Sequence, residues 1–238
     1  MNVLHFDSEA AWLSGTVSLW RDRLRMNPLL RHCLAGGNTP IPVFREMARS
    51  VQQGQVSFKR AAVFALDEFG GLAPDDTGRC SNMLIRDLIS QVDLAKDGFF
   101  CFNPDAPDLE MECRAYDAAA GNGFDLVVLG VGANGHLGMN EPGSPLDSPS
   151  RRTELHESTI RGSARYLTHR HLPRWGLTVG MKQLFASKEV WLVATGRAKA
   201  EIVARLVKGE ITEQVPASTM RRHSNCSLLV DDTAGALL

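Results

Sequence analysis

Two adjacent acids, Asp67 and Glu68, follow directly after the apolar run 61–66. A carboxylate at the mouth of an apolar cleft is poorly solvated, and its raised pKa suits it to remove a proton from a carbon beside a carbonyl or iminium group. The alternative is structural, with one acid capping a loop or a helix and the other solvated. The pair is therefore a candidate source of a general base, and both interpretations stay open on spacing alone.

The loop 130–150 offers a second chemistry, because His136 stands there between glycines and Glu141 follows five residues later. This spacing excludes one face of a helix, but the two side chains can converge in a bent loop. An imidazole oriented by a carboxylate is a competent proton shuttle near neutral pH. Although a lone histidine is usually structural, long loops inside compact domains are often functional, so we favour catalysis here. The loop's Gly-x-Gly does not continue as a dinucleotide site would.

The turn Gly36-Gly37-Asn38-Thr39-Pro40 lies between an apolar run and a helical pattern. Backbone N–H groups and a helix dipole would then point at one spot, which suits a phosphate. The turn lacks the Gly-Lys-Ser/Thr of a Walker A loop, so nucleotide triphosphate chemistry is not supported. A Gly-Gly turn can also be ordinary loop chemistry, and the turn alone does not decide between the two.

The elements that must position these residues alternate between apolar runs of strand length and helical patterns, which is typical of a parallel sheet. Ligands of such sheets bind outside the carboxyl ends of the strands, where all three candidate segments fall. We predict a single α/β domain over residues 1–238, with a doubly wound, mostly parallel, Rossmann-like sheet and helices on both faces. Strands are expected at 30–35, 61–66, 99–102, 125–129, 177–180, 190–195 and 227–230, and helices over 8–25 and from Ile41, Asn82, Leu109, Met181 and Lys199.

The composition argues against a nucleic-acid-binding protein, a membrane protein and a protein held by disulfides or zinc. The 238 residues are 44% hydrophobic and 22% charged with a net charge of −1, as in ordinary globular domains, and no basic field is present to hold nucleic acid. Neither a basic signal region nor a long apolar segment is seen, so we expect a cytoplasmic protein with no membrane partner. Five cysteines without a C-x-x-C pair indicate reduced thiols rather than disulfides or a zinc site.

The segment NGHLGMNEPG, residues 134–143, resembles the signature of glucosamine-6-phosphate deaminases, which share a superfamily with 6-phosphogluconolactonases. LAGGNTP resembles the family's phosphate loop, LDEFGGL its catalytic acid segment, and GLTVGMKQLFASKEVWLVATGRAKAE its C-terminal strand, helix and strand. These segments keep the family's order over most of the chain. The resemblance implies isomerisation and deamination of a 2-amino-2-deoxy-hexose 6-phosphate, with no metal and no cofactor.

The resemblance also implies a role for each matching position. Asp67 matches the acid that takes the C2 proton and returns it at C1, and His136 matches the histidine that opens the pyranose ring with Glu141 as its partner. Arg165 and Lys199 match the basic clamp on the 6-phosphate, although each alone would more often be a surface charge. The positions on the phosphate loop are Gly36, Gly37, Asn38 and Thr39.

One departure lies beside the histidine, where Asn134 stands in place of the Asp of many family members. Asn can orient an imidazole but supplies no charge, so we expect activity with an altered pH dependence or substrate preference. Asn134 and the segment RRHSN at 221–225 resemble galactosamine-type members, which keeps galactosamine 6-phosphate as an alternative substrate. The family includes monomers and larger assemblies, so the oligomeric state stays open.

Two rival functions remain. A 6-phosphogluconolactonase would share the phosphate loop and the Gly-His pair, but its loop generally continues with a Thr-x-Ser-Leu-Phe-Pro-like run, whereas this chain reads LGMNEPG. A non-catalytic sugar-phosphate sensor is disfavoured by the intact acid, histidine and glutamate.

Overall fold

The computed structural model describes residues 1–168 and 171–238, which form a central seven-stranded parallel sheet in the order β1-β10-β9-β6-β2-β3-β5. Its strands are β1 (Asn2–Phe6), β2 (Arg31–Leu34), β3 (Ala62–Ala65), β5 (Phe99–Phe100), β6 (Leu126–Gly130), β9 (Val190–Ala194) and β10 (Cys226–Asp231). Parallel strands buried on both faces are rich in apolar residues, which is why the apolar runs predicted most of them.

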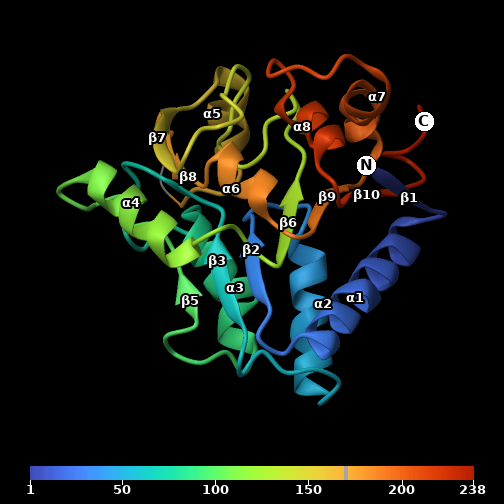
Figure 1. Cartoon of the computed structure of the whole chain (residues 1–238), viewed down its shortest axis with the longest axis horizontal. Helices are drawn as coiled ribbons and strands as arrows, with labels where there is room; N and C mark the ends of the chain where they lie inside the picture. Colours follow the sequence, from blue (N-terminus) through green and yellow to red (C-terminus); the bar gives the residue numbers. More distant parts are fainter. Residues whose placement is uncertain (169–170) are drawn as a thin grey trace.

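Helices cover both faces of this sheet, as predicted for a doubly wound fold (Figure 1). Successive strand residues point to opposite faces, so Cys33 joins one core and Leu34 the other. The core with Leu34 packs against α1 (Glu9–Met26), α2 (Ile41–Gln52) and α3 (Cys80–Asp87). The core with Cys33 packs against α4 (Leu109–Ala120), α6 (Met181–Ala186), α7 (Ala200–Lys208) and α8 (Pro216–Thr219). No helix of the described residues is long and apolar enough to cross a membrane.

A smaller antiparallel sheet in the order β4-β8-β7 stands beside the main one. The strand expected at 177–180 belongs here rather than to the parallel sheet, because it pairs with the three residues that follow β3 and Leu66. Figure 1 shows β7, β8 and α5 gathered on one side of the molecule. These elements are β4 (Asp67–Phe69), β7 (Arg151–Glu154), β8 (Trp175–Thr178) and α5 (Glu157–Ser163).

The other predicted elements are confirmed with shifted ends. The helix expected over 8–25 is α1, and the Ser8 side chain caps it by accepting the N–H of Ala11 (3.1 Å). The helix expected from Asn82 begins at Cys80, because the carboxylate of Glu68 caps it there. β1, β4, β7, α5 and α8 were not predicted.

Candidate active site

The candidate site lies at the carboxyl ends of the neighbouring strands β9, β6, β2 and β3. From β2 the chain adds β3 on one side and later β6 on the other, so the strand order reverses between β2 and β6. A ligand crevice is expected at such a reversal. A cavity of about 430 Å³ lies there, a volume suited to a small ligand. Each strand end contributes to its lining, with 36–40 after β2, Asp67 after β3, 130–133 after β6 and 198–199 after β9.

Asp67 lines this cavity as the first residue of β4 and is only 8% exposed. Burial raises its pKa from the ordinary 3.8 to about 6, against the lowering effect of a hydrogen bond with the Cys80 thiol; the charge of Glu68 raises it further and that of His136 lowers it. A carboxylate with this pKa is mostly ionised at neutral pH yet more basic than an exposed aspartate. Asp67 therefore has the place and the basicity of a general base.

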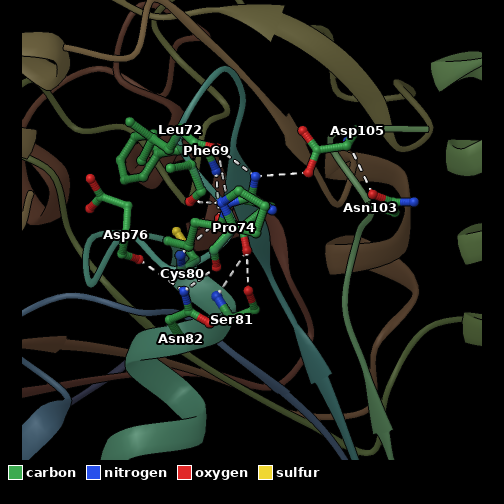
Figure 2. A network of polar contacts seen from close by, with 12 residues as sticks. Phe69, Leu72, Pro74, Asp76, Cys80, Ser81, Asn82, Asn103 and Asp105 are labelled. Atoms are coloured by element: carbon green, nitrogen blue, oxygen red, sulfur yellow. Dashed lines mark hydrogen bonds and ion pairs between the residues drawn. The ribbon is translucent and has the colours of Figure 1, made fainter. Parts of the chain in front are cut away.

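Glu68, in contrast, points away from the cavity and caps α3. Its carboxylate accepts the backbone N–H groups of Cys80 (2.8 Å) and Ser81 (3.0 Å) and the hydroxyl of Ser81. Because the residue before α3 provides no side-chain cap, these bonds satisfy donors at the helix start. Figure 2 shows this end of α3, where Cys80, Ser81 and Asn82 gather beneath the loop that carries Pro74. Of the two acids, one faces the cavity and the other fixes Cys80 beside it.

His136 and Glu141 meet within the loop 131–150, with His136 Nδ1 3.4 Å from Glu141 Oε2. Asn134 donates its side-chain amide to the same carboxylate (2.9 Å) and accepts the backbone N–H of His136 (3.1 Å). Burial alone would raise the pKa of Glu141, but hydrogen bonds from His136, Thr159 and Asn134, with the charge of His136, lower it to about 2. Glu141 is therefore an ionised acceptor behind the imidazole.

Two glycines in this loop leave room for the side chains of His136 and Asp67 to lie against the loop backbone. A Cβ on Gly132 would lie 2.3 Å from the ring of His136. A Cβ on Gly138, whose φ is +60°, would lie 2.8 Å from Leu66 and 3.2 Å from Asp67 Oδ2. Any larger residue would displace one of the two groups, so the glycine-rich loop is a steric requirement of the site.

The residues predicted to bind the phosphate line another part of the cavity. Lys199 donates to the carbonyl of Val131 (2.8 Å), and burial, together with the charge of Arg165, lowers its pKa. The guanidinium of Arg165 lies 5.0 Å from the ring of Tyr166, whose hydroxyl accepts the backbone N–H of Asn38 (3.3 Å). Two cations and the turn 36–39 thus converge on one region. The lining there includes Gly36, Gly37, Asn38, Thr39, Arg165 and Lys199.

The structure brings all the predicted residues together, with Asn134 and Glu141 behind His136 rather than in the lining. Sequence reasoning missed several residues of the cavity wall, of which Cys80, Thr159 and Tyr166 carry polar groups that contact the predicted residues. Only Tyr166 had a signal, since it adjoins Arg165. The other two reach the site through α3 and α5, whose packing has no local sequence pattern.

The segment 221–225 has a structural place. His223 is buried, and its Nε2 lies 2.9 Å from the carbonyl of Ser187. Asn225 donates to the carbonyl of Lys188 (3.0 Å). Among the described residues that line the cavity, none comes from this segment.

Comparison with known proteins gives a consistent result. Residues 10–229 match the family model "Glucosamine-6-phosphate isomerases/6-phosphogluconolactonase". A glucosamine-6-phosphate deaminase of Bacillus pumilus (strain SAFR-032) is 34% identical over 240 residues, which cover 100% of both chains. A solved monomeric glucosamine-6-phosphate deaminase has a TM-score of 0.95, 32% identity and 100% coverage of both chains. A 6-phosphogluconolactonase from Thermotoga maritima shares the fold, with a TM-score of 0.76 and 19% identity, covering 97% of this chain and 100% of that one.

Proposed function

Since the chain belongs to the glucosamine-6-phosphate isomerase/6-phosphogluconolactonase family, we propose that it converts glucosamine 6-phosphate and water to fructose 6-phosphate and ammonia. The observation that carries this proposal is the convergence of a buried carboxylate, a carboxylate-paired imidazole and two cations on one cavity. These groups meet the three needs of the reaction, namely a carbon base, ring opening and phosphate anchoring. The chain acts as one domain over residues 1–238, in the cytoplasm and in amino-sugar catabolism.

The first step opens the pyranose ring. His136 takes the proton of the anomeric hydroxyl and delivers one to the ring oxygen, while Glu141 holds the imidazole and Asn134 holds both the Glu141 carboxylate and the backbone of His136. An ionised carboxylate on Nδ1 stabilises the imidazolium that forms transiently. The product is the open-chain aldehyde, which makes the C2 proton acidic.

The second step moves a proton between carbons. Asp67 removes the C2 proton while a proton of the substrate's 2-ammonium group passes to O1, which gives an enolamine. Asp67 then returns its proton to C1, which leaves an iminium group at C2. Water then adds to C2 and ammonia leaves, which completes the ketose 6-phosphate. General acid–base steps of this kind contribute about 10²–10⁴-fold each.

Phosphate binding supplies the positioning for both steps. Arg165 and Lys199 can donate charge-assisted hydrogen bonds to the 6-phosphate, and the turn 36–39 can donate backbone N–H groups. Anchoring the sugar at one end fixes C1 and C2 relative to Asp67 and His136, which converts binding free energy into orientation.

One assay tests the function and its rivals. Ammonia and ketose phosphate are measured with glucosamine 6-phosphate, galactosamine 6-phosphate and 6-phosphogluconolactone as parallel substrates. We expect ammonia release with the highest kcat/KM on glucosamine 6-phosphate. A higher value on galactosamine 6-phosphate would change the substrate, lactone hydrolysis without ammonia would change the reaction, and no turnover of any of the three would indicate a binding protein.

A further inference from the structure

A threonine on α5 joins the pair formed by His136 and Glu141. Thr159 Oγ1 lies 3.1 Å from His136 Nδ1, closer than the 3.4 Å that separates Nδ1 from Glu141 Oε2. The same hydroxyl also hydrogen-bonds Glu141 and contributes to lowering the pKa of that carboxyl. Since N–H···O bonds are typically 2.7–3.2 Å long, the threonine hydroxyl is the better placed of the two acceptors for the imidazole N–H.

The chemistry of these groups fixes the direction of the bonds. Ionised Glu141 can only accept, so the hydroxyl proton of Thr159 points to the carboxylate. The hydroxyl oxygen then has lone pairs free to accept the Nδ1–H of His136. This arrangement favours the Nδ1–H tautomer and leaves the lone pair on Nε2, as a base for the anomeric hydroxyl requires.

We infer that Thr159 is a positioning residue for His136, which holds the imidazole in its Nδ1–H tautomer through a hydroxyl bridge to Glu141. The role in turnover rests on the proposed function, in which His136 opens the sugar ring. The bridge itself is a property of the protein without substrate.

The position of Thr159 also connects ring opening to the phosphate region. α5 carries Thr159, and Arg165 and Tyr166 follow it within one short segment that lines the same cavity. Ile160 and Tyr166 pack against a small apolar cluster that includes Phe69 and Met139. A phosphate that draws Arg165 inward would therefore act on the segment whose threonine orients the histidine.

The test compares Thr159→Val, which keeps the shape but removes the hydroxyl, with Thr159→Ser, which retains it. Thr153→Val is the matched control, because the hydroxyl of Thr153 donates to the backbone carbonyl of Glu154 in β7 (3.3 Å). Each variant is assayed on glucosamine 6-phosphate and on a 4,5-dideoxy analogue that cannot close a pyranose or furanose ring. NMR of the ¹⁵N-labelled imidazole of His136 reports its tautomer in the free protein.

We expect Thr159→Val to lower kcat on the closed sugar about tenfold, the effect of losing one hydrogen bond, with KM changed less than about twofold. Thr159→Ser should recover most of the rate, Thr153→Val should match the wild type, and the open-chain analogue should be turned over equally by all. The His136 spectrum should lose its Nδ1–H tautomer preference in Thr159→Val only.

Equal slowing of Thr159→Val on both substrates, or an unchanged His136 spectrum, would overturn the inference. If Thr159→Val does not fold, Thr159→Ala is read by the same two criteria. If the wild type released no ammonia from either amino sugar, the proposed function would fail, while the tautomer comparison would still decide whether Thr159 bridges the two groups.

Discussion

The two adjacent acids after β3 differ through their surroundings rather than their chemistry. Burial raises the pKa of both carboxyls, to about 6 for Asp67 at the cavity, but for Glu68 the hydrogen bonds from Ser81 and Cys80 at the start of α3, and from Phe69, oppose the rise. Since only Asp67 faces the space where a sugar can bind, Asp67→Asn should lower kcat at least about 100-fold, with sugar-phosphate binding largely kept. Solvent deuterium should enter C1 only with the wild type.

The matched control is Asp97→Asn, which makes the same change at an exposed position in the turn before β5. It should leave kcat unchanged. Retention of more than about a tenth of the wild-type rate in Asp67→Asn would remove Asp67 from the role of base, because loss of a general base costs at least about 10².

The pH dependence tests the environment of the same carboxylate. Turnover should fall as the pH drops below about 6, because Asp67 becomes protonated. The hydrogen bond with Cys80 lowers this pKa, so Cys80→Ala should move the acid limb of the kcat profile to higher pH. The sugar phosphate itself titrates with a pKa of about 6, but this titration is the same for the wild type and for Cys80→Ala, so it cancels in the comparison. Cys113→Ala, at a buried cysteine of α4, should leave the limb in place.

Residue types and spacing could mark the acid pair and the histidine, because these stand next to strand ends and glycines, whereas the basic residues were indicated only by the resemblance to the family. They could not identify Thr159 or Cys80. A threonine or cysteine in a polar stretch is ordinary, and only tertiary packing brings Thr159 within 3.1 Å of the histidine. Spacing likewise does not distinguish Asp67 from Glu68, and it is the cap on α3 that gives Glu68 its structural place.

At the scale of elements, the parallel strands were predictable because each is a short apolar run buried on both faces. The small sheet was not. β4 begins with two acids and β7 reads Arg-Arg-Thr-Glu, so neither has the composition of a strand, and each forms through pairing with β8. This sheet matters for function because β4 carries Asp67 and the chain passes from β7 into α5.

The cap on α3 gives a test at this scale. Glu68→Gln replaces one acceptor oxygen by an NH₂ group that faces donors, so it should lower the free energy of unfolding by about 1–2 kcal/mol. It should also lower kcat, because Cys80 loses its fixed place beside Asp67. Glu46→Gln, at a half-buried position of α2 whose carboxylate pairs with Arg49 at the surface, should change the free energy of unfolding by no more than about 0.5 kcal/mol and leave kcat unchanged. Urea unfolding and steady-state kinetics measure both, and an unchanged unfolding midpoint would show that the cap is dispensable.

The segment after α5 carries a second test. Arg165→Ala should raise KM for glucosamine 6-phosphate roughly 10- to 100-fold, the effect of losing charge-assisted bonds to phosphate. Arg161→Ala is the control, since Arg161 pairs with Glu157 on α5 (2.9 Å) and is exposed. Unphosphorylated glucosamine lacks the contact already, so both variants and the wild type should handle it equally poorly. A similar loss on both sugars would assign Arg165 to the fold rather than to the phosphate.

At the scale of the whole molecule, the site draws on segments that are distant in sequence, from the turn 36–39 to Lys199. Their meeting at one edge follows from the parallel order of the strands, which the alternation of elements made predictable. Burying an ionised carboxylate at this edge lowers the free energy of unfolding of the whole domain. The folded state binds the proton of Asp67 more tightly than the unfolded chain does, with a pKa of about 6 against an ordinary 3.8.

Stability from the protonated form of Asp67 is fully present below about pH 3.8, and it is lost as the pH rises through about 6, by up to about 3 kcal/mol. Asp67→Asn stays neutral and escapes this loss. Its free energy of unfolding should exceed that of the wild type by on the order of 1–3 kcal/mol at about pH 8, and by less at about pH 5. Urea titrations at both pH values measure the difference, with Asp97→Asn expected to follow the wild type. If Asp67→Asn were no more stable than the wild type at about pH 8, Asp67 would not be desolvated in the folded protein. Its pKa would then not be raised, and the argument that Asp67 is a strengthened base would fail.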